Sequence, residues 1–177
     1  PEIALLNVHL GIAPELANRT LYPYSYGMYP PASADVDALI ALFRYNKWTR
    51  AAVLYNPDML VDYNSFLLFQ DRINDTVNLT YTSFANPEHL PLEQLRRSYV
   101  RVIVSFLRDE TLNRVLCLAY FKNMTYPRYQ WILFNLNDDN NVSTFLHEGK
   151  QYDCSDEQLI AASSQSVIIV TENPYNT

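Results

Sequence analysis

Glycine is scarce in this sequence, with three residues among 177, whereas tyrosine occurs fourteen times. Phosphate-binding loops need closely spaced glycines, and neither G-x-G-x-x-G nor G-x-x-x-x-G-K-[ST] occurs. Basic residues are the minority, because thirteen of them face nineteen acidic residues, giving a net charge of −6. That charge argues against nucleic acid or an anionic membrane as a partner. No apolar run reaches the ~18 residues that a membrane-spanning helix requires.

The first fifteen residues, PEIALLNVHLGIAPE, have no initiator methionine and no basic flank. We interpret them as a strand that leads into a loop and not as a signal peptide. We therefore expect a piece of a longer protein, with any targeting or membrane segment outside it. The apolar fraction of 49% and the charged fraction of 18% are ordinary for a globular chain with one domain's worth of core.

From residue 33 onward, helix-like and strand-like runs alternate. Helices are predicted at 33–46, 59–73, 91–98, 109–123 and 155–163, and strands at 51–56, 77–84, 100–106, 129–135 and 166–172. The first helix has apolar residues at i, i+3, i+4 and i+7, with Ser33 as its expected N-cap. Ser155-x-x-Gln158 is a capping box before the last helix. The alternation predicts an α/β fold, a three-layer parallel sheet with helices on both faces.

Residues 1–29 follow a different pattern. The runs 3–10 and 22–29 are strand-like, and no helix separates them. We interpret the asparagine-containing loop between these two runs as a passage from one lobe to another.

Five Asn-x-Ser/Thr triplets begin at Asn18, Asn74, Asn78, Asn123 and Asn141. Chance predicts roughly two in a chain of this composition. The excess favours an extracellular glycoprotein, although asparagine-rich turns also create such triplets by accident. Three of the five, Asn18, Asn123 and Asn141, fall in predicted loops, whereas Asn78 falls in a predicted strand.

Residues with catalytic or metal-binding chemistry are few. Asp138 and Asp139 lie in a polar stretch that is more typical of a solvated loop than of an acid/base pair. The three histidines, His9, His89 and His147, have no metal-ligand spacing. A secreted α/β hydrolase would need a nucleophile elbow or paired carboxylates at strand ends, and neither is present. We expect no enzyme, no cofactor and no metal, and we expect Trp48 and Trp131 to pack in the core.

Several longer stretches together are distinctive. PELANRTLYPYSYGMYPP, LFRYNKWTRAAVLYN, VRVIVSF, VLCLAYFKNMTYPRYQWILFN and NPYNT follow one another along nearly the whole chain. In this order and spacing they resemble metabotropic type-B GABA receptors, which are class C G-protein-coupled receptors. The matching region is their extracellular Venus flytrap domain, which is similar to type I periplasmic binding proteins. The resemblance implies that residues 1–29 are a crossing segment from the first lobe and that 30–177 form the second, membrane-proximal lobe.

The resemblance also implies a disulfide. The family's cysteine that matches Cys117 is bonded to the one that matches Cys154. The residues alone favour the same bridge, since both cysteines occur with several glycosylation triplets. A buried free Cys117 and a catalytic thiol remain the alternatives, although no sequence pattern indicates a Cys/His pair.

The family's ligand-binding residues fall on five positions here. Its serine matches Ile12 or Ala13, its histidine Tyr29, its tyrosine Arg108 and its tryptophan Leu136, so none is kept. An arginine repels an ammonium group but pairs with a carboxylate, so Arg108 favours an acidic ligand. Its other interpretation is a solvated residue at a helix start. The implied ligand is a small amino-acid-like molecule, or none if the chain is a non-binding partner subunit.

The implied function is signalling by lobe closure at the extracellular face of the plasma membrane. The implied partners are a homologous receptor subunit in a dimer and a G protein, reached through a transmembrane domain outside this chain. Two alternatives share the fold: a soluble solute-binding protein, and the ectodomain of a single-span receptor of the natriuretic-peptide type.

Overall fold

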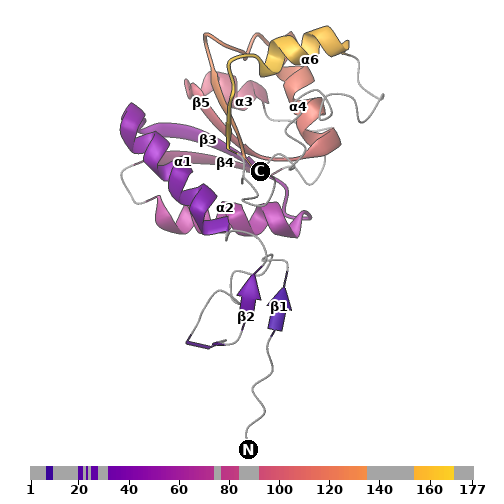
Figure 1. Cartoon of the computed structure of the whole chain (residues 1–177). Coiled ribbons are helices and arrows are strands. Elements are labelled where there is room, and N and C mark those ends of the chain that lie inside the picture. The colour runs from indigo at the N-terminus through magenta and orange to yellow at the C-terminus, as the bar shows by residue number, and fades with distance from the viewer. Residues whose placement is uncertain are drawn as a thin grey trace, which may run out of the picture.

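A computed structural model of the chain describes residues 7–9, 20, 21, 23, 25–27, 32–73, 77–83, 92–134 and 154–169. Its strands form two separate sheets (Figure 1). The small sheet pairs β1 (Asn7–His9) with β2 (Ser25–Gly27) in parallel. The large sheet contains β3 (Arg50–Tyr55), β4 (Asn78–Ser83), β5 (Val102–Phe106), β6 (Gln130–Phe134) and β7 (Val167–Ile169). All its pairings are parallel, in the order β4-β3-β5-β6-β7.

Helices cover both faces of the large sheet. The described helices are α1 (Ala32–Asn46), α2 (Leu60–Arg72), α3 (Leu92–Arg97), α4 (Asp109–Phe121) and α6 (Asp156–Ser163). Figure 1 shows α1 and α2 on one side of the sheet and α3, α4 and α6 on the other. The predicted three-layer α/β fold is therefore confirmed, and the predicted helices and strands are found within a few residues of their expected ends.

The two cores follow from the alternation of side chains along the strands. Ala51 and Val53 of β3 pack with α1 and α2, whereas Ala52 and Leu54 belong to the core under α4. Because each strand side faces a helix layer, β5 is buried at all five positions, as its apolar run predicts.

Four helix ends place a residue other than glycine in the left-handed backbone conformation. Residues with positive φ follow four helices: Lys47, Tyr99, Asn123 and Gln165, with φ between 53° and 62°. Glycine is the usual residue at this left-handed position, because a side chain there is disfavoured. Each of these helix ends therefore retains a small local cost.

The end of α1 is a Schellman motif. The Lys47 N–H donates to the Arg44 carbonyl at 3.2 Å, and the Trp48 N–H donates to the Phe43 carbonyl at 3.1 Å. The apolar contact that accompanies this motif is present, since the Phe43 and Trp48 rings meet edge-on at 5.5 Å. The motif thus fixes where the Trp48 indole lies.

Two expectations about individual residues, Ser33 as an N-cap and Trp48 in the core, are not fully met. Ser33 is not the N-cap of α1, because the helix already begins at Ala32 and Ser33 lies inside its first turn. Trp131 is buried as expected and donates its Nε1–H to the Met124 carbonyl at 2.7 Å. Trp48 is only partly buried, against the core of the α1 and α2 side.

None of the described helices is both long and apolar enough to cross a bilayer.

Candidate functional site

The strand order indicates where this sheet would bind a ligand. The chain runs from β3 to the neighbouring β4 and then returns to the other side of β3 to form β5. In open parallel sheets, ligands bind outside the carboxyl ends of the strands at such a point of reversal. The candidate site is therefore the edge where β3 and β5 end.

Two short segments form the described part of this edge. Tyr55 ends β3 and lies opposite Phe106, which ends β5. The next residue, Asn56, is half-buried and accepts a hydrogen bond through Oδ1 from the Asp58 N–H at 2.9 Å. Its carbonyl also accepts the Met59 N–H at 3.2 Å. This turn leads the chain directly from the strand into α2.

Aromatic rings gather beside the same edge. The Tyr55 ring stacks on Phe66 and Tyr63 of α2, with ring centroids 4.1 and 5.8 Å apart. Phe66 also meets the rings of Tyr81 and Phe106 edge-on. Tyr55 and Tyr63 are half-buried and Tyr81 is exposed. Ring faces at an open edge offer contact to the apolar or cationic part of a small ligand. Sequence analysis did not find this cluster, because its five rings come from four elements and only Tyr63 and Phe66, both in α2, are close in the sequence.

Arg108 is the predicted ligand residue that the structure describes. It follows β5, is half-buried and occupies the N-cap position of α4 with an extended backbone (φ −125°, ψ 168°). Its carbonyl accepts the Leu112 N–H at 3.2 Å, and its side chain makes no capping bond. The residue thus lies at the edge where the strands reverse. The other candidates, Ile12, Ala13, Tyr29 and Leu136, lie outside the described residues.

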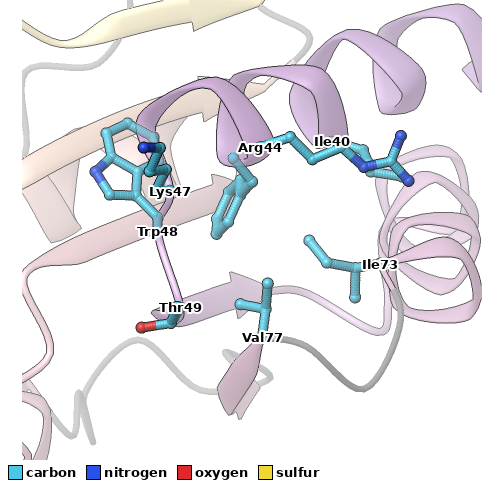
Figure 2. A pocket seen from close by; sticks show the side chains of 8 residues that line it. Ile40, Arg44, Lys47, Trp48, Thr49, Ile73 and Val77 are labelled. Atoms are coloured by element: carbon cyan, nitrogen blue, oxygen red, sulfur yellow. The ribbon is translucent and has the colours of Figure 1, made fainter.

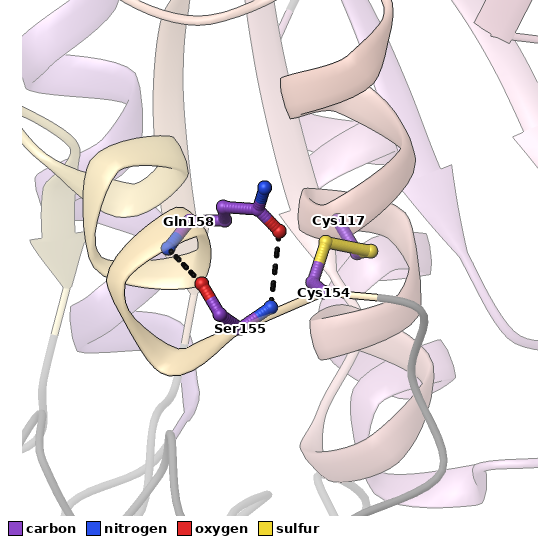
Figure 3. Close-up of a disulfide and its surroundings, with 4 residues drawn as sticks. All are labelled: Cys117, Cys154, Ser155 and Gln158. Atoms are coloured by element: carbon purple, nitrogen blue, oxygen red, sulfur yellow. Dashed lines mark hydrogen bonds between the residues drawn. A yellow bond between two sulfur atoms is a disulfide. The ribbon is translucent and has the colours of Figure 1, made fainter.

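The predicted disulfide is confirmed. Cys117 of α4 and Cys154, which precedes α6, are bonded with their Cα atoms 5.8 Å apart (Figure 3). The alternatives of a free or catalytic thiol at Cys117 are therefore wrong. The capping box is also confirmed, since Ser155 Oγ accepts from the Gln158 N–H at 3.3 Å and Gln158 Oε1 accepts from the Ser155 N–H at 3.0 Å. Together they fix the start of α6 against α4.

Two of the five glycosylation triplets begin at described residues. Asn123 is exposed in the turn after α4, where a loop was predicted. Asn78 is exposed at the first position of β4, which is an edge strand of the sheet. Asn18, Asn74 and Asn141 lie outside the described residues. Glycosylation remains a prediction at all five.

A hollow of about 210 Å³ opens at the opposite, amino-terminal edge of the sheet. Its walls come from the end of α1, the link to β3, the end of α2 and the start of β4 (Figure 2). Because ligands of this fold type bind at the carboxyl edge, this hollow is not the expected cleft. Within the described ranges, no three His, Cys, Asp or Glu side chains gather as a metal site would require.

Basic side chains near that amino-terminal edge are partly paired. Arg72 contacts Asp37 at 2.8 Å, while Arg96 and Arg97 contact Glu93 at 2.8 and 3.5 Å. The hydrogen bond from Arg96 lowers the pKa of the Glu93 carboxyl. All of these groups are exposed enough that each pair contributes little to stability.

Comparison with known proteins gives a consistent result. Residues 4–173 match the family model of the receptor family ligand binding region. Gamma-aminobutyric acid type B receptor subunit 2 of Homo sapiens is 26% identical over 155 residues, covering 84% of this chain and 16% of the relative. Subunit 1 of Mus musculus is 24% identical over 170 residues, covering 93% and 17%. Atrial natriuretic peptide receptor 3 of Homo sapiens is 26% identical over 157 residues, covering 81% and 28%.

These matches confirm the resemblance that the sequence motifs indicated. The chain spans about a sixth of the length of the two type B subunits.

Proposed function

The chain belongs to the receptor family ligand binding region, and on that premise we propose that it is part of the ectodomain of a type-B GABA receptor-like, class C G-protein-coupled receptor. In this proposal residues 1–29 cross from the first lobe, and 30–177 form the second, membrane-proximal lobe. The protein is a receptor and not an enzyme. It works at the extracellular face of the plasma membrane and binds a small amino-acid-like ligand between its lobes.

The observation that carries the proposal is the position of Arg108. It follows β5, where the strand order reverses, and its side chain is half-buried beside the start of α4. A guanidinium there suits a ligand carboxylate, because arginine binds carboxylates through two parallel hydrogen bonds. The nearby rings of Tyr55 and Tyr63 suit the remainder of such a ligand.

Closure of the two lobes would then transmit the signal. A ligand shifts a two-state equilibrium only through its better contacts in one state. A ligand that touches Arg108 and the first lobe has such contacts in the closed state. A homologous subunit is the proposed dimer partner, and a G protein engages a transmembrane domain outside this chain.

The test is a thermal shift of the complete two-lobed ectodomain against amino acids, including gamma-aminobutyric acid, glutamate and aspartate. Ligands that bind the native state raise the melting midpoint by mass action. We expect a rise with an acidic amino acid that the Arg108→Gln variant loses and the Arg128→Gln variant keeps. Arg128 is a matched control, because it is an exposed arginine in the turn before β6.

Two results would change the proposal. Equal shifts in the parent and in Arg108→Gln would remove Arg108 from the site. No shift with any amino acid would favour a non-binding partner subunit.

A second candidate follows from the similarity to atrial natriuretic peptide receptor 3. In that case the ectodomain belongs to a single-span receptor and binds a peptide. A shift with natriuretic peptides and none with amino acids would favour it. The remaining alternative, a soluble solute-binding protein, predicts a full-length transcript without membrane spans.

A further inference from the structure

The hollow at the amino-terminal edge has an apolar base. Ile40 and Phe43 of α1 and Ile73 at the end of α2 line it, and all three belong to the buried core. Figure 2 shows Ile73 and Val77 across the hollow from Trp48. Because the Schellman motif holds the Trp48 ring against Phe43, this wall is fixed before any ligand arrives.

Two cations stand on the α1 side of the hollow. Arg44 and Lys47 both line it, and both are exposed (Figure 2). Neither makes an ion pair with any residue in the described ranges, whereas Arg72 at the end of α2 pairs with Asp37. Figure 2 shows the Arg44 guanidinium and the Lys47 ammonium on opposite sides of the hollow. The chain as a whole carries a net charge of −6, so two uncompensated cations at one rim are not a product of general composition.

The backbone keeps Lys47 at this position. Lys47 has φ 55°, in the left-handed region where glycine or asparagine is favoured. Of the four residues that occupy this conformation in the described helix ends, Lys47 alone carries a charge. Its stem starts from a rigid turn and not from a mobile loop.

We propose that this hollow is a binding site for a small organic anion with an apolar ring. The ring lies among Trp48, Ile73 and Val77, and the long, exposed side chains of Arg44 and Lys47 turn from the rim toward the anionic group. The volume of about 210 Å³ lies below the ~300–1,000 Å³ of pockets for drug-sized ligands, so one or two fused rings are the largest fit. Apolar contact provides most of the affinity and the cations select for negative charge.

This inference does not rest on the proposed receptor function. The hollow lies at the start of β3 and β4, and the candidate cleft lies where β3 and β5 end. Anion binding in the hollow and amino-acid binding in the cleft can therefore succeed or fail independently of each other.

The test measures the affinity of the full chain for naphthalene-2-sulfonate by equilibrium dialysis, with 2-naphthalenemethanol as the uncharged analogue. The charge variants are Arg44→Gln and Lys47→Asn. Asparagine tolerates the left-handed conformation, so the second variant removes the charge and keeps the turn. Val77→Phe fills the hollow without altering a charge, and Arg128→Gln is the control. Melting midpoints establish that each variant is folded.

We expect the sulfonate to bind more tightly than the alcohol. Each charge variant should weaken sulfonate binding about tenfold, since a hydrogen bond to a charged group is lost. Val77→Phe should abolish binding, and Arg128→Gln should leave it unchanged. No sulfonate binding up to about 10 mM overturns the proposal. So do equal affinities for sulfonate and alcohol, an equal loss in the control, or binding that survives Val77→Phe.

Discussion

The disulfide between Cys117 and Cys154 offers the most quantitative prediction. It joins α4 to the start of α6 and closes a loop across a sequence separation of 37. In the chain-entropy model, a loop of this length restricts the unfolded chain by ~4 kcal/mol at 25 °C. The Cys117→Ala/Cys154→Ala variant removes the bridge without leaving an unpaired thiol. It should therefore lose about that much of its free energy of unfolding.

The melting temperature translates this loss into a measurable shift. At this chain size, 1 kcal/mol corresponds to roughly 2–4 °C, so the double variant should melt about 8–16 °C lower. Circular dichroism at 222 nm follows the loss of helical structure across the whole chain, α4 and α6 included. The parent protein under a reductant is the control and should fall by a similar amount, because both treatments release the same loop.

The reasoning depends on the bridge acting mainly on the unfolded state. If the double variant melts within about 2 °C of the parent, that claim is refuted. If the reduced parent loses stability and the double variant does not, the loss comes from another action of the reductant and not from opening the loop.

Three further predictions concern local structure, each measured as a change in the free energy of unfolding. Gln165→Gly should stabilise the protein by up to about 1 kcal/mol, because Gln165 has φ 62° after α6 and glycine adopts that conformation freely; destabilisation would contradict this. Ser155→Ala should cost about 1 kcal/mol by removing the capping box of α6, and Asp at the same position should restore most of it. Trp131→Phe should lower the free energy of unfolding by about 1–3 kcal/mol, because the buried Met124 carbonyl loses its hydrogen bond. An unchanged free energy of unfolding would contradict the importance of that hydrogen bond.

The fold was predictable because local and global patterns agree. The run VIVSF is apolar and rich in β-branched residues, and all five positions of β5 are buried. Ser155 and Gln158 have the spacing of a capping box, and the side-chain bonds form as that spacing predicts. The disulfide was predicted from the family resemblance, and the two cysteines of the chain allow no other pairing within it. Among the described residues, the N-cap of α1 was misplaced, because Ser33 lies one residue inside the helix, and Trp48 is only partly buried.

The candidate site was less predictable because its parts come from distant segments. Arg108 was identified through the family resemblance, as the position that matches the family's tyrosine, but its relation to Tyr55 depends on β3 and β5 being neighbours. That neighbourhood is a matter of strand order, which local periodicity does not specify. The hollow is similar: Ile73 and Val77 meet Trp48 only once α1 and α2 pack on the same face of the sheet.

The central claim is that the carboxyl edge of the large sheet receives the ligand. Hydrogen exchange of the complete ectodomain, with and without an amino acid that raises its melting temperature, tests this claim most directly. We predict that the ligand protects the amides of 55–59 and 107–112, which follow β3 and β5 at that edge. Protection confined to 47–49 and 98–101, at the opposite edge, would contradict the account.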